Sequence, residues 1–177
     1  MIYNIEEGLK KDALLQIVSK MAVAARTAPK SRGIDNICIS VVTDNTIKVL
    51  SDEMIRISKN SGPAFFARDA KNILSAGAIL LLGVKFKTIG LNCSYCGYEN
   101  CAEKEKYPEV PCAFNTTDLG IAVGSAVSIA ADNRVDNRVM YSVGVAVKNL
   151  KMMADDVKII FAIPISATGK NVFFDRK

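Results

Sequence analysis

The hydrophobic positions of this chain follow two different spacings, which together predict a mixture of helices and strands. In residues 5–27 apolar side chains recur at about every third or fourth position, which predicts one helix that ends before Pro29. Residues 37–43 are rich in β-branched side chains and predict a strand. Residues 78–84 are almost entirely apolar, as expected of a strand that is buried on both faces.

Three more segments have the spacing of helices. Residues 45–59 predict a helix that Asp44 or Asn45 can cap. A short helix is predicted around residues 65–73, after a Gly-Pro break in the chain. Residues 116–131 resume a helical pattern that is rich in small side chains.

The C-terminal third completes the order of elements. Residues 137–150 fit either a helix or a strand, and we favour a helix. Residues 157–165 predict a strand. Helices and strands in this order predict an α/β (α+β) fold of layered sheet and helices, forming a single domain over residues 1–177.

Four of the five cysteines lie in one short, polar and turn-rich segment. They are Cys93, Cys96, Cys101 and Cys112, all within twenty residues, whereas Cys38 stands far upstream in a predicted strand. Thiolates so close in sequence can converge on one metal centre. We therefore expect residues 88–114 to be an insertion that carries a metal cluster.

The chain contains no histidine, which limits the chemistry of this centre. Serine–histidine and cysteine–histidine catalysis, histidine-bound zinc and Rieske centres are excluded. A [4Fe–4S] cluster takes four thiolates: the loop from Cys93 to Cys101 can wrap around it, Gly97 relieves the turn, and Cys112 closes the site. Four-cysteine zinc and single-iron sites usually have two separated C-x2-C pairs, and here only Cys93 and Cys96 have that spacing.

Composition narrows the class of partner and the compartment. The chain of 177 residues is half apolar and has a net charge of +5, but its basic residues form no block, so we expect no nucleic-acid partner. It begins without a secretory signal pattern, and no uncharged apolar run is long enough to span a bilayer. We therefore expect a cytoplasmic protein with reduced cysteines and no membrane contact.

Several stretches of the chain also carry a family pattern. They are residues 25–33, 66–70, 90–93, 118–126, 136–142 and 164–176. In these residues the chain resembles a family of bacterial and archaeal proteins described as containing a ferredoxin domain. The resemblance implies an iron–sulfur cluster on the cysteines and a role in electron transfer.

A second resemblance concerns the scaffold. The Ala-Arg-Thr-Ala-Pro run that ends at Pro29, followed by a strand that leads to Asp44 and a helix, is similar to the opening of the nitroreductase family. The resemblance implies a nitroreductase-like layered sheet, bound flavin mononucleotide (FMN) and a homodimer. The Asn-x-Gln-Pro-Trp motif and the Arg-rich phosphate motif of that family are absent from this chain.

Four cations are candidates for holding a phosphate such as that of FMN. Arg26, Lys30 and Arg32 cluster around a predicted helix end, and Lys170 lies in the C-terminal segment. Arginine and lysine provide the charge-assisted hydrogen bonds that a phosphate needs. A solvated rim of charges is the alternative interpretation.

Together these patterns predict an iron–sulfur redox protein. The cluster would pass single electrons to a redox partner protein or to a bound flavin. Two alternatives stay open: a non-redox binding protein stabilised by a four-cysteine zinc site, and an FMN-dependent oxidoreductase with the cluster as a relay.

Overall fold

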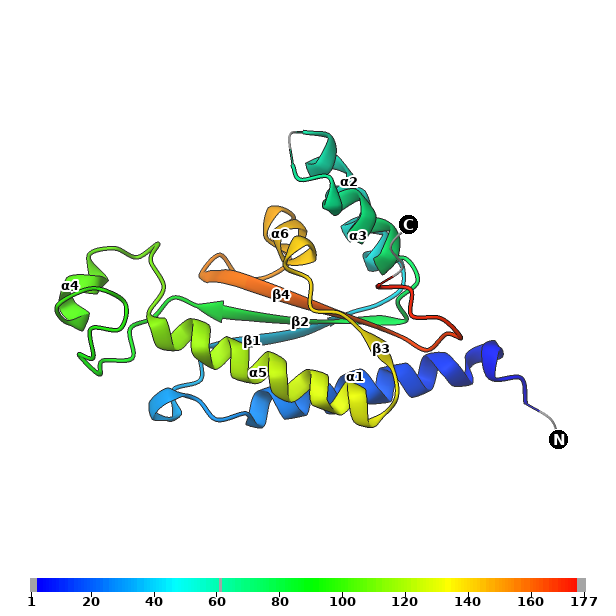
Figure 1. Ribbon diagram of the computed structural model, residues 1–177, viewed down its shortest axis with the longest axis horizontal. Helices are drawn as coiled ribbons and strands as arrows, with labels where there is room; N and C mark the ends of the chain where they lie inside the picture. The colour runs from blue at the N-terminus through cyan, green and yellow to red at the C-terminus, as the bar shows by residue number, and fades with distance from the viewer. Residues whose placement is uncertain (1–2, 61, 175–177) are drawn as a thin grey trace.

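The computed structural model, which describes residues 3–60 and 62–174, has a four-stranded antiparallel sheet between two layers of helices (Figure 1). The strands follow the order β1-β2-β4-β3 across the sheet. Their bounds are Ile37–Val42 for β1, Ala78–Lys85 for β2, Asp136–Asn137 for β3 and Val157–Ser166 for β4. The expected mixture of sheet and helices is confirmed.

The helices divide between the two faces of the sheet. One face is covered by α1 (Lys10–Thr27), which the π-helix η1 (Ile5–Leu9) precedes, and by α5 (Ala113–Asp132). The other face is covered by α2 (Asn45–Lys59), α3 (Phe65–Ile73) and α6 (Tyr141–Asn149). Two short elements, η2 (Ser31–Gly33) and α4 (Cys101–Glu105), lie in the connections.

Most of the predicted elements are present at nearly the expected bounds. The ambiguous stretch 137–150 divides: residues 141–149 form α6, as favoured, while Asp136 and Asn137 pair with the end of β4 as the short strand β3. The sequence did not predict β3, η2 or α4. A two-residue strand and single helical turns are too short for hydrophobic periodicity to detect.

The strand β2 lies in the middle of the structure and is buried on both faces, as predicted. Ala78, Leu80 and Leu82 point into a core shared with α1 and α5. Ile79 and Leu81 point into a second core shared with α2, α3 and α6. Successive side chains of a strand alternate between faces, so one continuous apolar run supplies both cores.

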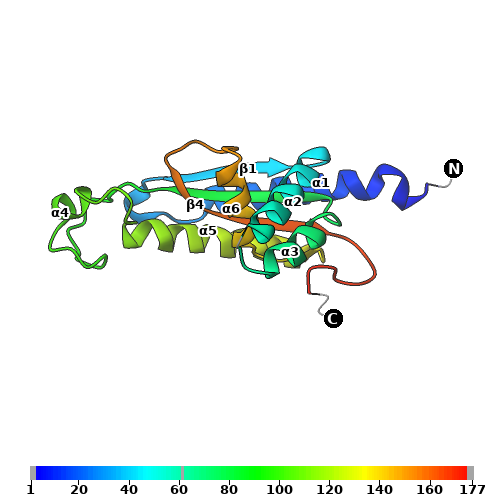
Figure 2. The same ribbon diagram turned by 90° about the horizontal axis from the view of Figure 1, so that it is seen from above.

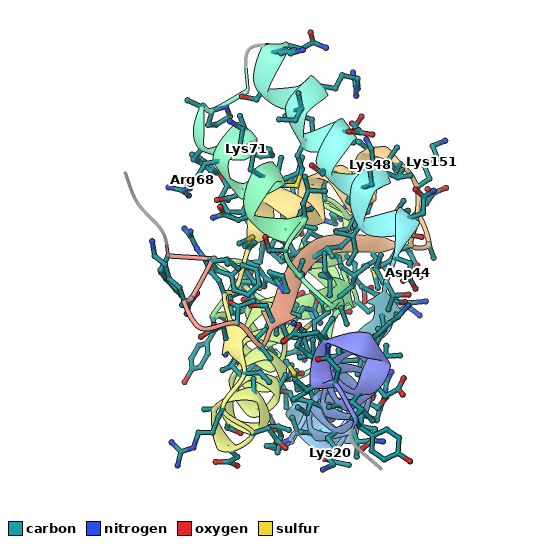
Figure 3. All side chains as sticks on the ribbon, turned by 90° about the vertical axis from the view of Figure 1, so that its right-hand side faces the viewer. Lys20, Asp44, Lys48, Arg68, Lys71 and Lys151 are labelled. Carbon is teal, nitrogen blue, oxygen red and sulfur yellow. The ribbon has the colours of Figure 1, made fainter. Side chains whose placement is uncertain are left out.

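The chain leaves the sheet at the end of β2 and returns through α5. Between them, the segment containing α4 projects beyond the end of the sheet, as Figures 1 and 2 both show. The other end of the molecule is seen in Figure 3, where the labelled Lys48 and Lys71 lie on the outer surface of α2 and α3. Within the described residues, no helix is both long and apolar enough to cross a membrane.

One local prediction is wrong in detail. Asp44 occupies the position before α2, but its side chain makes no capping hydrogen bond to that helix. Its carboxylate instead accepts a hydrogen bond from Lys11 Nζ at 2.6 Å. The bond to Lys11 raises the pKa of the lysine and, with a bond from Thr43, lowers the pKa of Asp44. The exposed pair thus links α1 to the start of α2.

Two glycines test the packing of the helical layers. A Cβ atom on Gly144 of α6 would lie 1.8 Å from the carbonyl oxygen of Ile160 in β4, whereas one on Gly124 of α5 would meet nothing within 4 Å. We expect Gly144→Ala to lower the free energy of unfolding by about 1–3 kcal/mol, because helix and strand must separate. Gly124→Ala is the matched control and should raise it by about 0.5–1 kcal/mol. Urea unfolding measures both, and a Gly144→Ala protein as stable as wild type would contradict this packing.

Candidate metal centre

The four clustered cysteines follow the C-terminal end of β2 and lie beyond that end of the sheet. Cys93 and Cys96 are in the loop after β2, Cys101 is the first residue of α4, and Cys112 is the N-cap of α5. All four line one small cavity. Its wall also includes Thr88, Ile89, Leu91, Tyr98, Lys104 and Phe114. The structure thus brings together the four cysteines that the sequence singled out.

The backbone of the cysteine loop turns back on itself at residues with left-handed conformations. Asn92, Ser94 and Gly97 have φ angles of 48°, 58° and 84°. The Gly97 N–H donates to the Ser94 carbonyl at 2.9 Å, which closes a turn around Cys96. Glycine adopts such a conformation at little steric cost, as the sequence predicted for Gly97.

Hydrogen bonds hold Cys101 and polarise its sulfur. The backbone N–H of Asn92 donates to Cys101 Sγ at 3.4 Å, and the side-chain oxygen of Asn92 accepts from the Cys101 N–H at 2.9 Å. Cys112 is buried at the N-terminus of the 20-residue α5, where the helix dipole favours negative charge. The thiolate is the form of cysteine that binds metal.

The five cysteines are free thiols. Among residues 3–60 and 62–174, no three His, Cys, Asp or Glu side chains are gathered at the spacing that a single metal ion needs.

The short helix η2 attaches both ends of the cysteine segment to the body of the protein. Arg32 Nη1 donates to the carbonyl oxygen of Ile89 at 2.9 Å and to that of Gly90 at 3.4 Å, where the segment begins. The backbone N–H and the hydroxyl of Ser31 donate to Asp118 Oδ1 at 3.1 and 2.8 Å, on α5 just after the segment ends. Asp118 is only 4% exposed, so these bonds are shielded from water.

Arg26, one of the four predicted phosphate ligands, is 48% exposed but pairs with groups of the protein itself. Its guanidinium donates to the carboxylate of Asp35 and to the carbonyl oxygen of Ile37 at 3.0 Å. Burial raises the pKa of Asp35, but the bonds from Arg26 and from the Ile37 N–H outweigh it, so the pKa is lowered. Arg26 thus fastens the end of α1 to the start of β1.

Lys30 is engaged in a similar way. Its side chain is 6% exposed, and its ammonium donates to three carbonyl oxygens at the C-terminal end of α1. Free carbonyls at a helix C-terminus attract cations. Lys30 therefore completes the hydrogen bonding of this helix end.

Lys170 does not join the other three cations. Ile37 of β1 pairs with Val84 of β2, while Ala78 at the other end of β2 pairs with Ile165 of β4. Lys170 is exposed and belongs to the segment after β4, which lies at the end of the sheet away from the cysteine segment (Figure 1). The length of β2, about 25 Å at the usual rise per residue, therefore separates the start of this segment from the end of the sheet near Arg26, Lys30 and Arg32.

Lys104 is a residue of the cavity that the sequence did not single out. Its side chain is 2% exposed and lines the cavity together with the four cysteines. It stands in a run of alternating acidic and basic residues, which is typical of a solvated helix face. The sequence could have indicated Lys104 in one way: it lies three residues after Cys101 and would therefore share a helix face with that cysteine.

The attachment through Asp118 can be tested by substitution. We expect Asp118→Ala to lower the free energy of unfolding by about 1–3 kcal/mol, because it leaves the partly buried donors of Ser31 without their acceptor. Limited proteolysis should also cut the cysteine segment faster. Asp132→Ala, at the exposed C-terminal end of the same helix, is the control and should change neither quantity. Equal behaviour of the two variants would contradict an anchoring role.

The fold resembles that of several solved nitroreductases. Nitroreductase CinD from Lactococcus lactis, in complex with nicotinic acid, has a TM-score of 0.60 and 11% identity, over 90% of this chain and 79% of CinD. A nitroreductase with bound FMN from Desulfitobacterium hafniense has a TM-score of 0.60 and 13% identity, with the same two coverages.

Nitroreductase A from Vibrio parahaemolyticus has a TM-score of 0.54 and 14% identity, over 88% of this chain. The chain spans only 59% of the length of that enzyme. At such identities the likeness concerns the fold, and the expected nitroreductase-like scaffold is confirmed.

The sequence has closer relatives. Residues 109–176 match a family described as "Uncharacterized protein containing a ferredoxin domain". A protein of Archaeoglobus fulgidus, described as "Uncharacterized protein", is 40% identical over 178 residues, covering 96% of this chain and 92% of its own length. The chain therefore belongs to the family of ferredoxin-domain proteins whose pattern its sequence carries.

Proposed function

We propose that the protein is an iron–sulfur electron-transfer protein in which Cys93, Cys96, Cys101 and Cys112 hold a [4Fe–4S] cluster. The observation that carries this proposal is the common cavity lined by all four free thiols. A bound cluster would supply one-electron chemistry, and the chain would supply its ligands and surroundings.

The surroundings of the thiols fit such a group. A backbone N–H already donates to Cys101 Sγ, and hydrogen bonds to sulfur are one means by which proteins tune cluster potentials. Ile89, Leu91 and Phe114 provide the apolar part of the cavity wall. The family description, which names a ferredoxin domain, supports the same assignment, although the matched residues 109–176 include Cys112 alone of the four.

A structural zinc site is the alternative for these cysteines. Four thiolates around one zinc lie about 3.8 Å from each other, given a zinc–sulfur distance of about 2.3 Å and tetrahedral geometry. A cluster presents four separate irons and accepts ligands that are further apart. Structural zinc sites usually have two separated C-x2-C pairs, and only Cys93 and Cys96 have that spacing here, which supports the cluster over zinc.

Flavin is a weaker candidate as a second cofactor. The Desulfitobacterium hafniense nitroreductase contains FMN, which makes the group a natural one to consider on this fold. The four cations expected to hold its phosphate do not all lie in one place. Arg26, Lys30 and Arg32 donate to groups of the protein itself, and the segment after β4, which carries Lys170, lies at the other end of the sheet (Figure 1). We therefore propose that the electron partner is a separate redox protein.

Metal and sulfide analysis of protein purified without oxygen tests the cluster. We expect about four irons and four acid-labile sulfides per chain, with a broad visible absorption that bleaches on reduction. The same spectrum should lack flavin bands. One zinc per chain without sulfide would contradict the proposal and would support a structural clamp.

Substitution of single cysteines tests the ligands. Cys96→Ser should lose most of the iron and sulfide, because it removes one of four thiolate ligands. Cys38→Ser is the matched control: Cys38 lies in β1, packs against the core of α2, α3 and α6, and should leave the iron content unchanged. Equal iron in the two variants would exclude Cys96 as a ligand.

A further inference from the structure

Lys104 is a buried cation at the wall of the cysteine cavity. It belongs to the five-residue helix α4, which begins with Cys101. Its side chain is 2% exposed, although lysine is seldom fully buried unless an anion pairs with it. The question is therefore which negative charge balances it.

The carboxylates of the cysteine segment do not provide that charge. Three of them are engaged elsewhere: Glu103 with Lys106 at 2.6 Å, Glu109 with Lys158 at 3.2 Å, and Glu105 with the Thr88 hydroxyl. Across the part of the chain that the structure describes, no carboxylate forms an ion pair with Lys104, and no acceptor takes a hydrogen bond from its ammonium. An ammonium buried without an anion is costly in free energy.

The four cysteines are the remaining source of negative charge. They line the same cavity as Lys104, and four thiolates around iron–sulfur or zinc carry a net negative charge. We propose that Lys104 is the buried counter-ion of the four-thiolate centre and raises its reduction potential. This inference rests on the proposed metal centre and names the residue that tunes it.

The counter-ion role has two consequences of opposite sign. When the centre takes up one electron from an external reductant, it gains one negative charge, and a nearby fixed cation stabilises that state. When the metal is absent and the thiols are protonated, the same cation lacks an anion and destabilises the fold. A purely structural lysine would instead stabilise the protein in both states.

Three variants separate these roles. Lys104→Met removes the charge but keeps an unbranched apolar chain, and Lys104→Arg keeps the charge. Lys106→Met is the matched control, because Lys106 lies two residues further along the chain, its side chain is 67% exposed, and it pairs with Glu103. Iron, sulfide and zinc are measured on every preparation before any other comparison.

A dithionite titration with mediator dyes then gives the midpoint potential of each iron–sulfur protein. We expect Lys104→Met to lower the one-electron reduction equilibrium constant by about tenfold, which corresponds to about 59 mV. Lys104→Arg and Lys106→Met should stay close to wild type. If Lys104→Met has the potential of Lys106→Met, the counter-ion inference is overturned while the cluster stands.

Two further outcomes also decide. If wild type holds zinc without sulfide, the proposed function fails. The counter-ion role then predicts that Lys104→Met loses about tenfold in zinc affinity against a chelator, and unchanged affinity overturns the counter-ion inference.

In metal-free protein, Lys104→Met should unfold at a higher urea concentration than wild type. A metal-free Lys104→Met that is destabilised or fails to fold would make Lys104 a structural residue and would also overturn the inference.

Discussion

Both faces of β2 are buried, and the other elements are arranged around this constraint. Each face needs its own cover, so α1 and α5 pack on one side and α2, α3 and α6 on the other. The neighbouring strands β1 and β4 satisfy the backbone of β2 along its length. β2 therefore runs the full length of both cores before it ends at Lys85. The cysteine segment begins after that point and projects beyond the sheet.

The projecting segment would be loosely held without its anchors. Ser31 and Arg32 of one short turn bind Asp118 after the segment and the carbonyls of Ile89 and Gly90 before it. A site for a metal cluster needs this kind of support, because ordering a long loop costs conformational entropy. The same turn follows Lys30, whose ammonium completes the end of α1.

On the other face of the sheet, one buried carboxylate joins segments that are far apart in sequence. Asp69 of α3 accepts a hydrogen bond from the Ser142 hydroxyl at 2.7 Å and pairs with Arg68 at 2.8 Å. Arg138 lies 3.8 Å from the same carboxylate and donates to the carbonyl oxygen of Phe173. Three of the stretches that carry the family pattern therefore meet at one point. Their shared task there is to hold α3, α6 and the C-terminal segment together.

Local pattern was sufficient for the elements and for the set of cysteines. Helical and strand spacing depends on residues a few positions apart, so α1, α2, α5, β1, β2 and β4 could be predicted from the printed sequence, although α1 and α5 begin five residues later and three residues earlier than expected. The grouping of the four cysteines could be predicted for the same reason, because they are near neighbours in the chain.

The tertiary structure alone decided what each cation does. Arg26, Lys30 and Lys104 are similar charged residues in the sequence, yet one pairs with Asp35, one binds carbonyls at a helix end, and one is buried beside the cysteines. The sequence alone could not show that the segment of Lys170 lies far from Arg26 and Lys30, because this follows from the antiparallel register of the sheet. Such roles depend on partners far away along the chain, such as Asp118 for Ser31 at a separation of 87 residues. Periodicity reports the nearest neighbours of a residue, and only packing brings the distant ones together.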